Sequence, residues 1–226
     1  MIGMTIQDQI KDIKAQLRLF MNGAVSHSMR EKGLRYKLNL GVDLPRIKEI
    51  AAAYEPNHDL AQALWKEDVR ECRILAALLQ PTESFYPEIA DIWVERIDNI
   101  EMAEMTSMHL FQRLSYAPAK SFAWMADERE YVQVCGFLTA SRLLRTKGDM
   151  EERAAEQLLD QAFTAAHSEH YHVRQAALLV VRSYMRHSPE NAFRVCRLIE
   201  GLKDSENECT RRLCAVVQEE AEAIAD

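Results

Sequence analysis

The chain has few of the residues that interrupt helices or join domains, with only seven glycines and six prolines among its 226 residues. It contains no Ser- or Gly-rich stretch, and its charged residues are spread along the whole length, so no segment has the composition of a flexible linker or a disordered tail. A chain of this size can bury one substantial core. We therefore expect one domain that spans residues 1–226.

Long apolar runs are also missing. The chain has no run of about 18 apolar residues, the length needed to cross a bilayer as a helix. The N-terminal residues MIGMTIQDQIKDIK become polar too early for a signal peptide. These features argue against a membrane protein and predict a cytoplasmic location.

Metal-binding and common catalytic motifs are absent as well. A cluster of His167, His170 and His172 falls in one predicted turn, which could hold a metal or could be merely polar and exposed. We favour the polar turn, because a structural zinc site needs four ligands, and we expect no metal. No glycine-rich phosphate loop, G-x-S-x-G elbow or Cys/His dyad is present. No C-x-x-C pair occurs among the five cysteines, which we expect to be reduced and mostly buried: Cys72, Cys135, Cys196, Cys209 and Cys214.

The net charge of −7 is unevenly distributed along the chain. Residues 1–40 and 106–150 carry +4 and +2, whereas residues 41–105 and 151–226 carry −8 and −5. Proteins bind duplex DNA mainly through its phosphates, so a DNA-binding face requires that folding gather the basic residues on one side. The composition by itself argues mildly against nucleic acid.

What the sequence does contain is helical periodicity over almost its whole length. Apolar residues step by three or four from Ile6 through Ile10, Ile13 and Leu17 to Phe20, and Thr5 stands where an N-cap is expected. A second helix is predicted after Asp43, with Pro45 in its first turn and Ile47, Ile50, Ala51 and Tyr54 on one face.

A repeated local pattern indicates how these helices are organised. An apolar residue is followed by polar ones, a small residue three places on and a long apolar run, in Val69–Leu79, Val132–Ala140 and Val173–Val181. The spacing of 41 residues between Val132 and Val173 lies within the roughly 40 to 47 of HEAT and armadillo units. We therefore predict an all-α fold, an α/α superhelix (solenoid) of HEAT-like repeats, which binds its ligand on an extended concave surface.

Three segments resemble the DNA alkylation repair family of the AlkD type: Gly41–Arg46, Leu60–Arg73 and Trp93–Glu104. The resemblance covers most of the chain, from about the first helix to Met185. It implies a curved stack of HEAT-like helix pairs that holds double-stranded DNA in a basic concave face and excises cationic alkylated purines without a metal or other cofactor.

The residues that the resemblance assigns to catalysis are largely replaced. The D-x-W-D-x-x-D turn of the family falls on residues 98–104, where isoleucine stands at position 100 and the catalytic aspartate becomes Glu104. An Arg-Arg pair falls on Gln133 and Val134, and a second tryptophan falls on Leu179. The candidate catalytic residues are therefore Glu104 and Glu101, three residues apart on one helix face, although two such glutamates can also be an ordinary solvated pair. We expect weak glycosylase activity or none.

A basic N-terminal region offers a candidate DNA-binding surface, with Lys11, Lys14 and Arg18 as its possible extension along the first helix. The other interpretation is a solvated face that balances the acidic segment beside it. Arg70 and Arg73 could also contact phosphate, but pairing with Glu67 and Glu71 is favoured. The candidate DNA-binding residues are Arg30, Lys32, Arg35, Lys37 and Arg46.

The leading functional hypothesis is a monomeric, DNA-binding relative of the alkylpurine glycosylases that recognises damaged or structured double-stranded DNA. The second hypothesis is a HEAT-repeat scaffold that binds a protein partner. The three tryptophans, Trp65, Trp93 and Trp124, could be stacking surfaces in the first case, but their apolar neighbours at helical spacing favour a place in the core.

Overall fold

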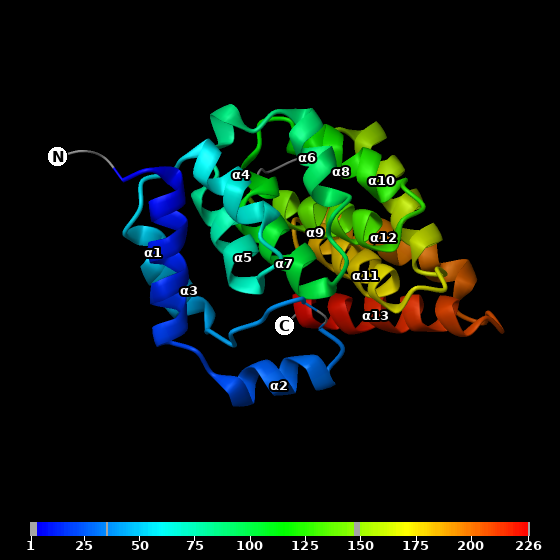
Figure 1. Ribbon diagram of the computed structural model, residues 1–226. Helices are drawn as coiled ribbons and strands as arrows, with labels where there is room; N and C mark the ends of the chain where they lie inside the picture. The colour runs from blue at the N-terminus through cyan, green and yellow to red at the C-terminus, as the bar shows by residue number, and fades with distance from the viewer. Residues whose placement is uncertain (1–3, 35, 147–149, 226) are drawn as a thin grey trace. The chain divides into compact units, whose positions relative to one another are not determined.

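The computed structural model describes residues 4–34, 36–146 and 150–225. Within these ranges the regular structure is helical apart from one isolated bridge between Leu38 and Val69, which confirms the all-α prediction (Figure 1). None of the described helices is long and apolar enough to span a membrane. The α-helices are α1 (Ile6–Leu19), α2 (Gly23–Glu31), α3 (Leu44–Ala52), α4 (His58–Lys66), α5 (Arg70–Leu79), α6 (Pro87–Val94), α7 (Ile100–His109), α8 (Ala117–Met125), α9 (Glu130–Thr146), α10 (Glu152–Ala165), α11 (Tyr171–Met185), α12 (Pro189–Ile199) and α13 (Glu208–Ala225).

The chain forms two compact units. Unit 1 contains Met1–Trp93 and Glu104–Leu114, and unit 2 contains Val94–Ala103 and Ser115–Asp226. Helix α7 contributes residues to both units. A single domain over residues 1–226 stays a prediction.

The predicted start of α1 is confirmed, because Thr5 accepts a hydrogen bond from the backbone N–H of Asp8. Its predicted apolar stripe is buried at Ile10, Ile13 and Leu17. The prediction is wrong for Phe20, which is the C-cap residue and is 41% exposed. The backbone leaves helical geometry at this residue, so its ring no longer points with the stripe.

The predicted start of α3 is also confirmed. Asp43 accepts a hydrogen bond from the N–H of Arg46 at 2.9 Å, and Pro45 lies in the first turn, where its missing N–H has no cost. The helix buries Ile47, Ile50 and Ala51 but ends at Ala52, before the predicted Tyr54.

In unit 1, α4 and α5 pack as a pair, α3 packs on α5, and α1 packs on α4. The rings of Trp65 and Trp93 stack within this core with centroids 4.1 Å apart, and Phe85 meets Trp93 edge to face. The Trp93 indole donates a hydrogen bond to Gln62. Trp65, Trp93 and, in unit 2, Trp124 are all buried, which confirms their place in the core.

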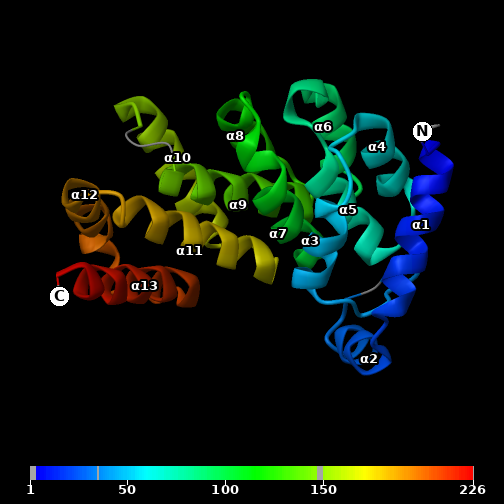
Figure 2. The ribbon, with the colours of Figure 1, turned by 90° about the vertical axis from the view of Figure 1, so that its left-hand side faces the viewer.

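Unit 2 is built around α11, which packs against α9 on one side and α13 on the other, with α10 and α12 covering it (Figures 1 and 2). The Ser141 and Ser183 hydroxyls share a buried hydrogen bond of 2.7 Å between α9 and α11. Helix α8 packs on α9 at Gly136, where a Cβ would lie 2.4 Å from the backbone nitrogen of Met125. Only glycine fits here, because the two helix backbones approach so closely.

The repeated sequence pattern coincides with the second helix of three pairs: α5, α9 and α11. Its first residue is buried in each copy, at Val69, Val132 and Val173. The small residue three places on is buried as well, at Cys72, Cys135 and Ala176. The pattern therefore marks the positions at which neighbouring helices pack together.

Candidate nucleic-acid interface

The predicted N-terminal basic region is only partly one surface. Arg30 lies near the end of α2 and Lys32 directly after it, and both are exposed. Arg35 lies outside the described residues. Lys37 is exposed and lines a pocket of about 250 Å³ together with Lys14 and Arg18 of α1.

This pocket of unit 1 also contains acidic groups. Lys14 pairs with Glu67 at 2.7 Å, and Asp68 pairs with Arg73 at 3.3 Å. Within the described residues, Arg18 and Lys37 have no such partner, so their charges are available to an anion. The suggested extension of the basic region along α1 is therefore limited here to Arg18.

The Arg46 side chain is held by contacts with other residues of unit 1. Its guanidinium lies over the Phe20 ring, 4.3 Å from the centroid, and pairs with Glu49 of the same helix. A cation on an aromatic face keeps its charge but loses freedom to reach a phosphate. Arg46 is thus a weaker candidate than its position in the sequence suggested.

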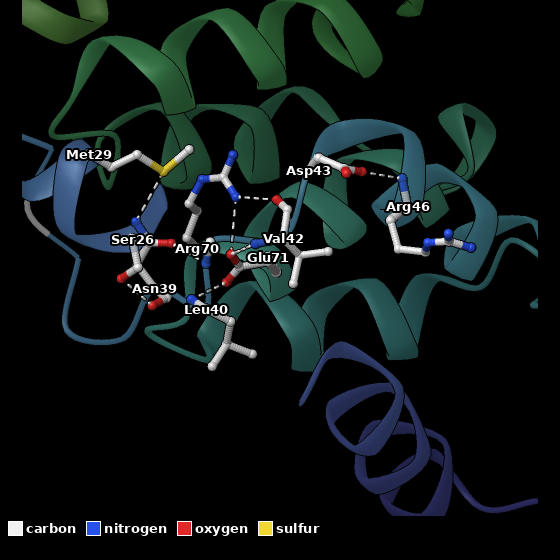
Figure 3. Close-up of polar contacts among 10 residues, drawn as sticks. Ser26, Met29, Asn39, Leu40, Val42, Asp43, Arg46, Arg70 and Glu71 are labelled. Carbon is white, nitrogen blue, oxygen red and sulfur yellow. Dashed lines mark hydrogen bonds and ion pairs between the residues drawn. The ribbon is translucent and has the colours of Figure 1, made fainter. Parts of the chain in front are cut away.

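The buried pair Arg70–Glu71 has a structural role (Figure 3). The Glu71 carboxylate accepts hydrogen bonds from the backbone N–H groups of Leu40 and Val42, both at 3.2 Å, and pairs with Arg70 at 3.0 Å. Arg70 also donates to the Val42 carbonyl at 2.9 Å. Pairing is thus confirmed for Arg70 with Glu71. For Arg73 the predicted partners are wrong, because it pairs with Asp68.

Helix α7 carries both candidate catalytic glutamates. Asn99 begins the helix by accepting a hydrogen bond from the N–H of Met102 at 3.0 Å. Glu101 is half-buried and Glu104 is exposed. A carboxylate is therefore present at the surface where the resemblance expects one, and its catalytic use stays a prediction.

The replaced family positions are occupied by uncharged side chains without an aromatic ring. Gln133 donates its amide to the Met125 carbonyl at 2.9 Å, and Val134 is completely buried. Ile100 is half-buried at the start of α7, and Leu179 is 42% exposed on α11. The structure therefore offers neither an arginine nor an aromatic ring at these four positions.

Arginines that the sequence analysis did not select gather between α11 and α13 in unit 2. We call this pocket, of about 710 Å³, the arginine groove. Its functional side chains are Tyr171, Arg174, Gln175, Arg211 and Arg212, and Glu208 is the carboxylate that lines it. Tyr171 is 60% exposed, and the Arg174 guanidinium lies over its ring.

A second basic pocket of about 410 Å³ lies between α9 and α11 and contains Leu179. Arg145, Arg182 and Arg186 line it. Two of these arginines are countered by α13: Arg182 pairs with Glu219 at 3.3 Å, and Arg186 binds the buried Glu220 carboxylate. Its net positive charge is therefore smaller than its arginines suggest.

The sequence analysis missed both groups because their members come from different helices and, apart from Arg145, lie in a segment with a net charge of −5. The sequence does contain one local signal for the arginines of the arginine groove. Arginine follows the first residue of the repeated pattern at Arg70 and Arg174, and Arg211 stands at the equivalent place in α13.

The three histidines of the predicted turn contact different partners in the structure. His167 contacts the Phe163 carbonyl and the Thr210 hydroxyl, whereas His170 pairs with Glu130 at 3.4 Å. His172 lies against the rings of Tyr131 and Tyr171. No cluster of metal-ligating side chains occurs among the residues that the structure describes.

Two titrating groups are shifted by their surroundings. Burial, followed by the charges of Glu130 and Asp98, raises the pKa of Tyr131, so its hydroxyl remains neutral. Burial raises the pKa of the Cys72 thiol to about 12, which makes it unreactive. Cys72, Cys135 and Cys214 are buried and Cys196 and Cys209 are half-buried, and all five are free thiols.

Comparison with known proteins decides the family. A family model described as DNA alkylation repair enzyme matches residues 13–197. The chain belongs to the DNA alkylation repair enzyme family. The predicted resemblance is thereby confirmed, and the match covers α2 to α11 completely, the second half of α1 and most of α12.

Two solved structures were compared with the fold of this chain. One, described as "A new family of proteins related to the HEAT-like repeat DNA glycosylases with affinity for branched DNA structures", superposes with a TM-score of 0.79 at 13% identity and covers 94% of both chains. A designed armadillo repeat protein superposes with a TM-score of 0.42 at 12% identity over 78% of this chain and 86% of that one. No curated protein matches the sequence. The first similarity confirms the HEAT-like repeat fold of this member of the DNA alkylation repair enzyme family.

Proposed function

We propose that this protein binds double-stranded DNA, with a preference for branched or otherwise structured sites, and excises alkylated bases weakly or not at all. Membership of the DNA alkylation repair enzyme family supports the DNA ligand. The similar solved structure, described as having affinity for branched DNA, supports the structured site. In this proposal the protein acts in the cytoplasm and as a monomer.

The observation that carries the proposal of weak excision is the replacement of both tryptophans and both arginines of the family pattern, at Ile100, Leu179, Gln133 and Val134. Excision of an alkylated purine passes through positive charge on the base and then on the sugar, which aromatic faces and a placed carboxylate stabilise. Each lost aromatic contact removes about 0.5–2 kcal/mol. Buried Val134 and hydrogen-bonded Gln133 cannot replace the missing arginines.

The charge distribution favours binding to branched or otherwise structured DNA over non-specific binding to duplex DNA. The chain has a net charge of −7, so most of its surface repels phosphate. Positive charge is concentrated in the arginine groove of unit 2 and, in unit 1, at Arg18 and Lys37. Positive charge confined to small sites favours a few local phosphate contacts over binding along a whole duplex.

A gel-shift titration with a four-way junction and a linear duplex of the same arm sequence tests this proposal. We expect tighter binding to the junction and an affinity that falls steeply with salt, because bound phosphates release counterions. The absence of any shift at low salt contradicts DNA binding and favours the protein scaffold. Equal affinities for junction and duplex contradict the preference for branched sites.

Release of methylated purine from alkylated duplex tests the catalytic part. We expect release close to the uncatalysed rate. Rapid release that Glu104→Gln abolishes contradicts the proposed weak activity and assigns catalysis to that carboxylate. Glu88→Gln, an exposed glutamate of α6, is the matched control.

A further inference from the structure

The arginine groove combines three kinds of side chain in one pocket of unit 2. It holds an exposed aromatic ring at Tyr171, an amide at Gln175 and the three guanidinium groups of Arg174, Arg211 and Arg212. Its volume of about 710 Å³ is within the range of pockets that take small molecules, roughly 300–1,000 Å³. With Glu208 as its lining carboxylate, the groove has an excess of positive charge.

Two of the arginines are held in place before any ligand arrives. Arg174 donates to the carbonyls of Ser168 and Glu169 at 2.7 and 2.9 Å. Arg211 donates to the carbonyl of Glu206 at 2.6 Å and more weakly to that of Ser205. Because these bonds fix the side chains, an anion bound there costs less conformational entropy. Arg212 has no ion pair or hydrogen bond within the described part of the chain and is exposed.

Tyr171 provides the apolar part of the groove. It is the first residue of α11, and 60% of its surface is exposed although its ring is large. The Arg174 guanidinium, 5.9 Å from the ring centroid, and the His172 ring, 5.4 Å away, hold the tyrosine in position. A fixed and open aromatic ring beside arginines is the arrangement with which proteins bind unpaired bases.

We propose that the arginine groove binds an unpaired nucleotide of single-stranded DNA, with its base stacked on Tyr171 and its phosphate at Arg211 and Arg212. This inference rests on the proposed DNA binding and names the part of a branched DNA that unit 2 recognises. A fully paired duplex keeps its bases stacked and cannot offer one to the ring. A fork with single-stranded arms has unpaired bases that can stack on the Tyr171 ring.

Two substitutions test the groove at exposed positions, Tyr171 and Arg212, and leave in place the hydrogen bonds that hold Arg174 and Arg211. We expect Tyr171→Ala to weaken binding of a fork with single-stranded thymidine arms by roughly tenfold and to leave the blunt duplex unchanged. Tyr171→Phe keeps the ring and is expected to bind as the wild type does. Arg212→Ala is expected to reduce the salt slope for a thymidine oligonucleotide by about 0.7.

Helix α12 provides a matched control. There Arg197 lies over the exposed ring of Phe193, 6.0 Å from the centroid, the same arrangement outside the groove. Phe193→Ala is expected to leave all DNA affinities unchanged. An equal loss in Phe193→Ala and Tyr171→Ala contradicts a specific groove.

A thiol gives an independent measurement on the wild-type protein. Cys209 lines the groove and is half-buried, and Cys196 of α12 is also half-buried but lies outside the groove. We expect a thymidine oligonucleotide to slow maleimide labelling of Cys209 and to leave Cys196 unaffected. Equal labelling of Cys209 with and without the oligonucleotide contradicts the proposal.

The outcomes separate the two proposals. If the junction and duplex bind but single-stranded arms add nothing, or Tyr171→Ala binds like the wild type, the groove proposal is wrong and DNA binding stands. If neither junction nor duplex binds but the oligonucleotide protects Cys209, the groove is correct and the proposed function is wrong. If no DNA binds and no protection appears, both are wrong.

Discussion

Arg174 and Arg211 make the same contact in successive helix pairs, 37 residues apart. Each donates from Nη1 to the two carbonyls that precede it by five and six residues, Ser168 and Glu169 for Arg174, and Ser205 and Glu206 for Arg211. In α9, Gln133 occupies the corresponding place and reaches the Met125 carbonyl. These two arginines therefore tie the turns before α11 and α13 to the helices that follow them, whereas Arg70 of α5 donates to the Val42 carbonyl.

Arg211→Met tests the contribution of these hydrogen bonds to stability. The substitution removes charge-assisted hydrogen bonds to two carbonyls and is expected to lower the free energy of unfolding by about 1–2 kcal/mol, because the site is partly solvated. Arg212→Met, at the exposed neighbouring position, is expected to change it by less than about 0.5 kcal/mol. Urea unfolding of both variants measures the difference, and similar values contradict a structural role for Arg211.

Glu71→Ala is expected to be among the most damaging changes in unit 1. It leaves the backbone N–H groups of Leu40 and Val42 without this acceptor and removes the carboxylate that pairs with the buried Arg70. Removing one member of a buried pair costs about 3–5 kcal/mol. In contrast, Glu67→Ala breaks a partly exposed pair with Lys14 and is expected to cost no more than about 1 kcal/mol. Thermal unfolding with circular dichroism compares them.

Gly136→Ala is expected to destabilise unit 2 although alanine favours helices. Its Cβ would lie 2.4 Å from the Met125 nitrogen and 2.8 Å from the Trp124 carbonyl carbon, so α8 must shift. Such overpacking costs about 1–3 kcal/mol. Gly23→Ala in α2 meets no atom within 4 Å and is expected to be neutral or stabilising. Equal stability of the two variants would contradict the close approach.

Stability should depend on pH through Asp127. The Arg129 side chain and backbone N–H hydrogen-bond to this carboxylate and lower its pKa. The unfolded carboxyl titrates near about 3.9, so the stabilisation is complete above that pH and is lost as pH falls through the lower pKa of the folded state. Asp127→Asn is expected to lower the free energy of unfolding by roughly 1 kcal/mol at pH 7. It is also expected to make that free energy depend less on pH at the acidic end. Unfolding curves of wild type and variant that stay parallel from pH 7 to pH 2 would exclude this role.

Glu219→Gln is expected to strengthen DNA binding. Glu219 pairs with Arg182 at the edge of the second basic pocket. Its removal leaves Arg182 with only the longer contact of 3.7 Å to Glu220, so the guanidinium is more available to phosphate. The salt slope for duplex is then expected to become steeper by about 0.9, the value for one added phosphate contact. Glu222→Gln makes the same change in net charge at an exposed position of α13 and serves as the control. Identical slopes in the two variants would show that only net charge matters.

Short-range signals predicted the all-α class, the starts of two helices and the repeats, and the resemblance of three segments predicted the family. Thr5 and Asp43 cap their helices as predicted, and Val69, Val132 and Val173 are buried at the start of theirs. Caps and apolar periodicity depend on residues within one or two turns of each other, so they can be recognised in the sequence. The same local signals predicted core positions for the tryptophans.

The distribution of charge could not be predicted in this way. Arg46 follows a cap and seemed available to DNA, but the displaced Phe20 ring and Glu49 hold it. Arg174 and Arg212 come from different helices and share a groove only because α11 packs beside α13. Which side chains meet across two helices depends on how those helices pack, and local spacing carries no record of that contact. The sequence therefore specified a HEAT-like member of the DNA repair family, and packing between helices determined where its free arginines gather.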